Sequence, residues 1–483
     1  MNLLESYEAL LANWDGVFSQ SRSTERASRL AFGLLTCLRT HLTSNAICAT
    51  GRQFQDWSAD YRLFSRSPWD PHGLFDPVWD RLSGLLPADA PVVVALDDTL
   101  CKKTGRHIPG VSTARDPQSL PFHVNLCRGL RFVQASVLVH SAQAPGPARA
   151  LPVRFEPAPP AAKPNKDATE QERQLYRQEK KRRALTQVGV NTLTALRQEM
   201  DRRPDLRDRL LLASGDGSYT NGRVLKPLPP KTTFIGRIRR DAKLYWPLPA
   251  APGQAGKGRP RRYGPAAPTP EEILQAPTVA EIRVRVFAAG QQRDIPVKVV
   301  EMVYWRSSGP AMPLKLVLIK PLGYRLRKGS KLLYRHPAFL ICTDPQLEIG
   351  VLLQAYIDRW EIECNHRDEK SLLGVAQGQV RSPQAVPRLP QFQVAAYSLL
   401  LLAALLASGF QRTNDYLPLP LWRRQSIRPS LLDLLNLLRD QLFARSVAAR
   451  PAGNFVDFAS TLPPNAKAPK FQITAHRLCT MAA

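Results

Sequence analysis

One charged stretch decides the fold prediction: Tyr356-Ile-Asp-Arg-Trp-Glu-Ile-Glu-Cys-Asn-His-Arg-Asp-Glu-Lys-Ser-Leu-Leu-Gly374. It contains no proline and no glycine before Gly374, so it predicts a helix. On a helical wheel of about 100° per residue, four polar side chains share one arc of about 60°. They are Tyr356, Arg359, Glu363 and Lys370. A carboxylate can ligate a metal ion, and cations and a phenol can hold phosphate oxygens, so this face suits a phosphodiester site. The alternative is a solvated face with intrahelical ion pairs.

The spacing Tyr-x2-Arg-x3-Glu-x6-Lys resembles the signature of the bacterial insertion-sequence DDE transposases of the YREK-signature branch. Trp360, Ile362 and Gly374 also match the usual wording around that signature. The resemblance implies a third catalytic acid at Glu363, preceded in the chain by two catalytic aspartates that each follow a buried strand. It also implies DNA-phosphate binding by the other signature residues, which are Tyr356, Arg359 and Lys370.

The first aspartate follows the apolar run Pro91–Leu96, which predicts a buried strand ending at Asp97-Asp98-Thr99. An N-cap is the alternative role for these residues. However, 102–105 (Lys-Lys-Thr-Gly) predicts a loop and no helix. Neighbouring strand residues point to opposite faces, so only one aspartate can face a metal. The resemblance assigns the first metal ligand to Asp97, with Asp98 as the alternative first acid.

The second aspartate repeats this arrangement, because the apolar strand 209–214 leads into Gly215-Asp216. Asp-Gly is also a common turn pair, which is the alternative interpretation. The motif Asp-x-x-Tyr, from Asp216 to Tyr219, matches the resemblance and implies that Asp216 is the second catalytic acid and metal ligand.

The elements between the two aspartates complete a prediction of an α/β fold. Strands at 123–127 and 131–139, with Gly129 between them, predict a hairpin. Residues 167–200 predict one long helix whose basic middle, 177–183, is either solvated surface or a DNA-backbone contact. Together these elements indicate a ribonuclease-H-like catalytic core.

The long connection from Asp216 to Glu363 predicts an insertion. Four runs in it predict strands: 232–238, 279–287, 295–303 and 314–319. The Pro/Gly-rich segment 247–271 predicts a basic loop, and 338–343 predicts the last strand before the Glu363 helix. The resemblance suggests that Trp305, at the end of a predicted strand, receives a flipped base; a tryptophan in the core of the insertion is the alternative.

We therefore expect a ribonuclease-H-like core interrupted by a β-rich insertion, with helical regions at both ends. The expected segments are 1–88 (helical, DNA-end binding), 89–222 (first part of the core), 223–334 (insertion), 335–410 (second part of the core) and 411–483 (helical region and tail). Short helices within 1–88 suit a helix-turn-helix module or a plain helical bundle. The apolar run Val394–Ala407 is too short to span a bilayer and predicts a buried helix.

Composition points to a polyanionic partner, since 67 Lys and Arg against 40 Asp and Glu give a net charge of +27. The seven cysteines are scattered without a C-x-x-C pair, which argues against a disulfide framework or zinc site and for a reducing compartment. The start of the sequence lacks the pattern of a signal peptide, so we expect a cytoplasmic, nucleoid-associated protein that does not bind membranes.

The expected activity is that of a DNA transposase that cleaves element ends and transfers them to target DNA. Such chemistry uses two Mg²⁺ ions about 3.5–4 Å apart, which Mn²⁺ can replace. The expected ligands are Asp97, Asp216 and Glu363, and the expected partners are terminal inverted repeats, target DNA and a second copy of the chain. His366, about 60° from Glu363, is expected to face DNA or solvent. The alternatives are an inactive transposase-derived DNA-binding protein and another metal-dependent ribonuclease-H-like nuclease.

Overall fold

A computed structural model gives the fold. It describes residues 1–116, 119–120, 122–141, 146–248, 261–325, 329–423 and 426–448. Two predicted segments fall outside these residues: the tail from 449 onward and positions 249–260 of the basic loop.

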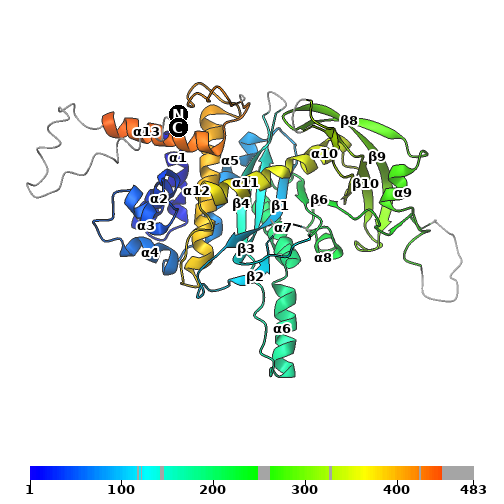
Figure 1. Cartoon of the computed structure of the whole chain (residues 1–483), viewed down its shortest axis with the longest axis horizontal. Coiled ribbons are helices and arrows are strands. Elements are labelled where there is room, and N and C mark those ends of the chain that lie inside the picture. The colour runs from blue at the N-terminus through cyan, green and yellow to red at the C-terminus, as the bar shows by residue number, and fades with distance from the viewer. Residues whose placement is uncertain are drawn as a thin grey trace, which may run out of the picture.

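The helices lie at both ends of the chain and around the sheet (Figure 1). Their bounds are α1 (Leu3–Ala12), α2 (Ser21–Thr36), α3 (Thr43–Ala49), α4 (Ser58–Ser65), α5 (Asp76–Leu85), α6 (Glu170–Arg182), α7 (Leu185–Asp201), α8 (Gly222–Leu225), α9 (Pro270–Gln275), α10 (Ile349–Asp358), α11 (Trp360–Ser371), α12 (Ala385–Ser408) and α13 (Leu431–Ala448), with short 3-10 helices η1 (Asn13–Gly16) and η2 (Pro71–Phe75). The predicted helical character of the two ends is confirmed in the described residues.

The strands alternate with these helices in the middle of the chain. Their bounds are β1 (Val92–Lys102), β2 (Ser112–Arg115), β3 (Leu126–Val139), β4 (Arg149–Pro157), β5 (Leu211–Gly215), β6 (Thr232–Arg237), β7 (Leu244–Tyr245), β8 (Glu281–Ala288), β9 (Gln291–Trp305), β10 (Pro313–Ile319), β11 (Gly323–Tyr324), β12 (Leu333–Tyr334) and β13 (Ala338–Cys342).

Five strands form the centre of the fold in the order β4-β3-β1-β5-β6. β3 is antiparallel to β1 and β4, whereas β5 is parallel to β1 and β6. An antiparallel meander joined to two parallel strands is the arrangement of a ribonuclease-H-like core. The predicted α/β fold class is therefore confirmed.

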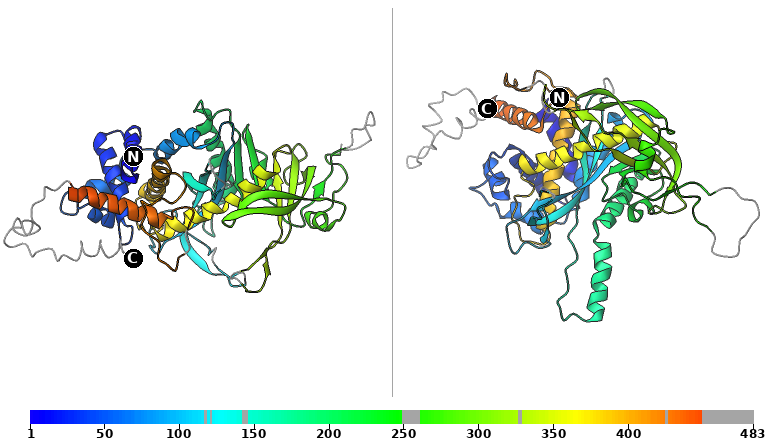
Figure 2. Two further views of the ribbon diagram at one scale, coloured as in Figure 1. Left: turned by 90° about the horizontal axis from the view of Figure 1, so that it is seen from above. Right: turned by 45° about the vertical axis from the view of Figure 1, so that its right-hand side comes forward.

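Helices cover both faces of this sheet (Figures 1 and 2). On one face Ala95 of β1 packs with Ile362 of α11. On the other face Leu96 approaches Gly189 of α7. Adjacent strand residues alternate between faces. Odd-numbered residues of β1 after Ala95 therefore face α11, and even-numbered residues after Leu96 face α7.

α12 is long and apolar enough to cross a membrane, but 94% of its apolar window is buried inside the protein. The helix begins at Ala385, so the prediction that it is too short to span a bilayer was wrong, and the prediction that it is a buried helix is confirmed. It packs against β4 and the N-terminal helices, so one apolar core joins the two ends of the chain to the sheet.

β1 does not end at Asp97-Asp98, as the sequence predicted, but continues to Lys102. Its pairing with β5 stops at Leu96, whereas its pairing with β3 continues to the end of the strand. Beyond Leu96, β3 alone supplies hydrogen bonds to β1. The extension lacks an apolar run, so the local sequence did not predict that it is a strand. Both aspartates therefore lie within a strand.

The predicted hairpin at Gly129 is also wrong, because β3 is one uninterrupted strand. Gly129 lies opposite Lys102, and a Cβ there would lie 2.7 Å from the carbonyl oxygen of Cys101. The glycine permits close approach of two strands and does not mark a turn.

The predicted single helix over 167–200 is two helices, α6 and α7, separated at Ala184. Ala184 has extended backbone angles (φ −62°, ψ 141°). α7 packs on the sheet, whereas α6 buries none of its residues and projects from the body (Figures 1 and 2).

The strand predicted at 232–238 was assigned to the insertion, but β6 pairs in parallel with β5 over five positions and belongs to the core. The insertion continues the same sheet, because β13 bonds β6 on one side and β10 on the other. The predicted β-rich content between β6 and α10 is confirmed by β8, β9 and β10.

The contact between α7 and the sheet predicts the effect of enlarging Gly189. A Cβ at this position would lie 2.8 Å from two ring carbons of buried Tyr219. Gly189→Ala should lower the free energy of unfolding by about 1–3 kcal/mol in urea titrations, because such overpacking displaces the ring. Gly84→Ala, in α5 with no atom near the new methyl group, is the control and should be neutral or stabilising by about 0.4–1 kcal/mol. Equal behaviour of the two variants would contradict the close packing.

Candidate active site

The pairing register of β1 and β5 brings the first two predicted acids together. Leu96 lies opposite Gly215, so Asp97 and Asp216 directly follow paired positions on parallel neighbours. Asp97 follows Ala95 on the face covered by α11, and its side chain is 16% exposed. The third predicted acid lies in the helix over this face.

Arg359 connects the first acid to the third. Its Nη1 atom lies 3.3 Å from Oδ2 of Asp97, and its Nη2 atom lies 3.5 Å from Oε1 of Glu363. The Arg359 side chain is 16% exposed, so its contact with Asp97 is largely shielded from water, whereas Glu363, at 38%, is more open to solvent. β1 and α11 are thereby held together at the two carboxylates.

Asp98 faces the opposite side of the sheet and has its own partners. The Tyr219 hydroxyl donates to Oδ1 of Asp98 at 3.4 Å, and Nε of Arg131 lies 3.6 Å from Oδ2. The alternation of β1 thus separates the two adjacent aspartates, and of the two Asp97 is the one that pairs with Arg359. Arg131 was not singled out from the sequence, because nothing local indicates that β3 brings it to Asp98.

Electrostatics show that these carboxylates are crowded. The pKa of Asp97 is raised to about 7: burial raises it most, Arg359 opposes the shift, and the nearby charge of Asp216 adds to it. Burial also raises the pKa of Asp98, with Arg131 opposing and Asp216 adding to the shift. An added cation would relieve this repulsion.

Asp216 occupies the turn after β5. Its Oδ1 atom accepts from the backbone N–H of Ser218 at 2.8 Å, and its Oδ2 atom accepts from the Ser218 hydroxyl at 3.2 Å. The turn interpretation of Asp-Gly is therefore correct in local structure. This turn also fixes the orientation of a carboxylate beside Asp97.

The predicted single helix is interrupted at Arg359, which ends α10 and precedes α11. There the hydrogen bonding tightens, since the N–H of Ile362 donates to the carbonyl of Arg359, three residues back. Tyr356 remains on α10, half-buried against the second apolar core that α10 forms with β5, β6 and β10. Lys370 lies on α11, close enough for its charge to lower the pKa of Asp98.

His366 was expected to face DNA or solvent, and this prediction was wrong. It is 9% exposed, and burial, followed by the charges of Lys370 and Arg359, lowers its pKa to about 3. The charge pattern of the sequence did not reveal that α11 buries a polar face against the sheet. Glu361, in contrast, pairs with Arg428 at 2.8 Å, away from the acids.

Trp305 ends β9, is half-buried, and packs against the main core. In the part of the chain that the structure describes, no recorded hydrogen bond or ring contact joins it to the acids. The flanking turn, however, approaches the second acid segment, since the N–H of Gly222 donates to the Ser307 hydroxyl at 3.2 Å.

The acids suit a hard divalent cation by the chemistry of their donors, since all three supply carboxylate oxygens. In the described residues, no three His, Cys, Asp or Glu side chains converge as a complete metal site. Instead the Arg359 guanidinium bridges Asp97 and Glu363. The three carboxylates are therefore suitable metal ligands by their chemistry and their negative charge. In this structure the positive charge beside Asp97 and Glu363 comes from Arg359.

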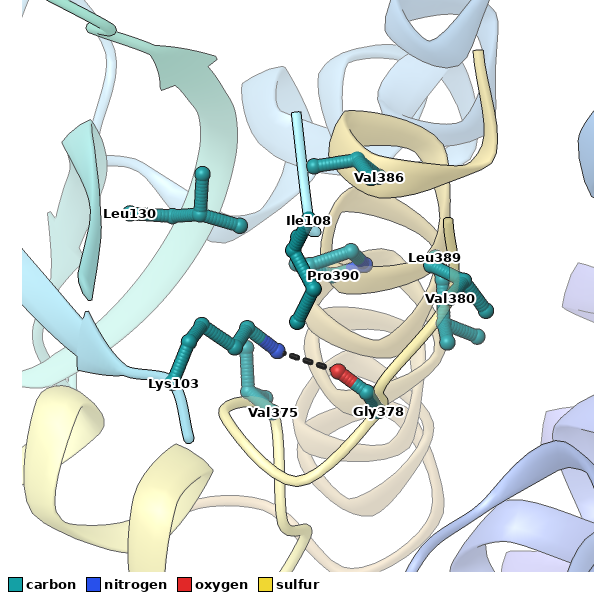
Figure 3. A pocket seen from close by; sticks show the side chains of 9 residues that line it. All are labelled: Lys103, Ile108, Leu130, Val375, Gly378, Val380, Val386, Leu389 and Pro390. Atoms are coloured by element: carbon teal, nitrogen blue, oxygen red, sulfur yellow. Dashed lines mark hydrogen bonds between the residues drawn. The ribbon is translucent and has the colours of Figure 1, made fainter. Parts of the chain in front are cut away.

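A narrow apolar cleft near the end of β1 is a structural joint and not a substrate site (Figure 3). The buried Lys103 ammonium crosses it and donates to the carbonyls of Ala376, at 2.7 Å, and Gly378, at 2.5 Å. The lining side chains leave no room for a bound molecule. Lys103 thus ties β1 to the loop that follows α11.

Comparison with known families matches residues 17–295 to the DDE superfamily endonuclease family. This span exceeds half of the chain and includes Asp97 and Asp216. The chain belongs to this family, whose members are metal-dependent nucleases acting on DNA. Glu363 lies beyond the matched residues, so its assignment as the third acid stays a prediction from the signature spacing. No curated protein gives a significant match to the sequence.

The buried Glu369 predicts a pH dependence of folding. It is 1% exposed, and burial raises its pKa from 4.5 to about 8. The folded state therefore retains a proton that the unfolded chain releases, so stability falls as pH rises from about 5 to 8. Glu369→Gln should remove this fall, by a few kcal/mol at most, in urea unfolding at about pH 5 and pH 9. An unchanged pH dependence in the variant would contradict a buried, protonated Glu369.

Proposed function

We propose that this chain is a DNA transposase of the YREK-signature insertion-sequence branch, acting in a bacterial cytoplasm. It cleaves DNA at element ends and transfers the cleaved ends to target DNA. The observation that carries the proposal is the junction of β1, β5 and α11, where Asp97 directly follows the position paired with Gly215 and shares Arg359 with Glu363. This junction gathers carboxylates from three distant parts of the sequence.

Asp97, Asp216 and Glu363 are the proposed ligands of two Mg²⁺ ions, which Mn²⁺ can replace. Bound ions of this kind activate a nucleophile and stabilise the leaving oxygen of a phosphodiester. The protein contributes positioning: the Asx turn orients Asp216, and Arg359 holds Glu363 over β1. Burial of Asp97 limits water around the reacting phosphate and strengthens local electrostatics.

The cations of α11 are proposed to hold DNA phosphates. Arg359, which contacts Asp97 and Glu363, would be free to bind a phosphate if those carboxylates held metal ions, and Lys370 would supply a second charge. The half-buried Tyr356 adds a phosphate contact through its hydroxyl, and Trp305 is proposed to stack on a flipped base.

The proposed DNA partners are terminal inverted repeats and target duplex, bound by a homodimer. The net charge of +27 supports a polyanion partner of this size. DNA-end binding is assigned to the helices of 1–88. These helices pack on α12 as part of the main core, so DNA bound there is held rigidly relative to the sheet.

A paired substitution on α11 tests the site. Glu363→Gln should reduce nicking of a plasmid carrying the element ends by roughly a hundredfold or more, because a metal ligand is lost. Glu361→Gln makes the same chemical change two residues away, where the side chain pairs with Arg428, and should retain nicking. Equal activity of the two variants would overturn the proposed role of Glu363. Nicking without joining to target DNA would identify a nuclease and not a transposase.

The two adjacent aspartates provide a second matched pair. Asp97→Asn should abolish cleavage in Mg²⁺ while leaving binding of the DNA ends within about tenfold, because phosphate contacts persist. Asp98→Asn should be milder, since Asp98 faces Tyr219 and Arg131 on the other side of β1. Gel-shift and nicking assays on the same preparations measure both effects. Full activity of Asp97→Asn together with an inactive Asp98→Asn would reverse the assignment.

A further inference from the structure

α6 is a helical arm whose sides touch little of the protein. None of its residues is buried, and it projects away from the sheet in two views (Figures 1 and 2). A capping box stabilises its start: the Thr169 hydroxyl accepts from the N–H of Glu172, and the Glu172 carboxylate accepts from the N–H of Thr169. A helix this short is marginal in water without packing, so an arm of this kind is suited to packing against a partner.

The arm has one cationic face. On a wheel of about 100° per residue, four cations fall within an arc of about 100°. They are Arg173, Arg177, Lys180 and Lys181. The acids Glu172 and Glu179 lie about 130–150° from the centre of that arc, and Glu179 pairs there with Arg182 and Arg183. The acid on the cationic face is Glu170, which pairs with Arg177 at 3.2 Å where both side chains are well exposed.

The arm leaves the protein near the strand ends that carry the predicted acids. α6 is followed by α7, and Gly189 near the start of α7 lies against the Tyr219 ring. The hydroxyl of that ring donates to Asp98. Asp98 and α7 lie on the face opposite Asp97, but they share the strand ends that carry Asp97 and Asp216, so a duplex longer than the site can pass from these strand ends to α6.

We propose that the cationic face of α6 binds the phosphate backbone of the DNA duplex that flanks the cleaved bond. This inference rests on the proposed function and adds a second DNA contact outside the active site. DNA is indicated by the charge and length of this face: the first and last cation are eight positions apart, or roughly 12 Å along the helix. At 3.4 Å per nucleotide of one strand, that length spans about three to four consecutive phosphates.

The test compares two triple variants with equal change in net charge. The first neutralises the arm with Arg177→Gln, Lys180→Gln and Lys181→Gln, and glutamine preserves helix propensity. The control carries Arg202→Gln, Arg207→Gln and Lys231→Gln. These exposed cations precede β5 and β6 and so lie near the opposite ends of these strands from Asp216. The probe is a fluorescein-labelled mixed-sequence duplex, titrated with full-length protein at several salt concentrations.

Loss of three phosphate contacts should lower the slope of log affinity against log salt by roughly 2.7. Between about 50 and 200 mM salt, the affinity of the unmodified chain should then fall roughly 40-fold more than that of the arm variant. The control variant should retain the original slope. Lys180→Arg with Lys181→Arg should also retain it, because the charges remain.

Several outcomes would overturn the inference. One is an unchanged slope in the arm variant, and another is an equal loss in the control variant. A third is that the arm variant binds DNA normally but sediments as a smaller species than the unmodified chain. That result would show that the arm contacts a second copy of the chain. Nicking by the unmodified chain with an inactive Glu363→Gln variant would leave the proposed function standing in each of these cases. If the unmodified chain neither binds nor nicks DNA, the proposed function itself fails.

Discussion

The parallel pairing of β1 with β5 is the constraint on which the site depends. It places Leu96 opposite Gly215, so the following aspartates emerge side by side although more than a hundred residues separate them. Gly215 also has a packing role, because a Cβ there would lie 2.8 Å from the Phe234 ring of β6. A larger residue would displace either β6 or the turn that carries Asp216. The backbone thus concentrates negative charge that the folded protein must neutralise.

The sequence predicted those elements whose signal is local. Apolar runs identified β1, β5, β10 and β13, and the signature spacing identified the helix of Glu363. The errors came from interactions between distant segments. The polar end of β1 is a strand because β3 pairs with it. Position 129 requires glycine because the Cys101 carbonyl leaves no room for a Cβ there. In the site, motif spacing predicted which carboxylates to propose as catalytic, whereas Arg131 and the burial of His366 depend on packing that no short motif encodes.

A buried polar layer under α11 explains why this helix has little apolar sequence although one face is covered. The Tyr397 hydroxyl donates to Oδ1 of Asn365 at 3.1 Å. The Asn365 amide in turn donates to the Ser136 hydroxyl at 3.1 Å and to the Ala150 carbonyl at 3.2 Å. These bonds join α11 to α12, β3 and β4, so the height and rotation of α11 over the sheet are set by directional contacts. A purely apolar contact would position Glu363 less strictly.

The way in which the insertion joins the core has a consequence for truncation. β6 would be the open edge of a five-stranded sheet, but β13 occupies that edge and β10 and β9 follow it. An open edge presents unpaired backbone groups to any other chain. Excising the insertion up to β10 as if it were a separate domain would therefore uncover the edge of β13 that β10 now covers. The shortened protein would be prone to edge-to-edge aggregation, so a catalytic fragment must keep β13 and β10 in place.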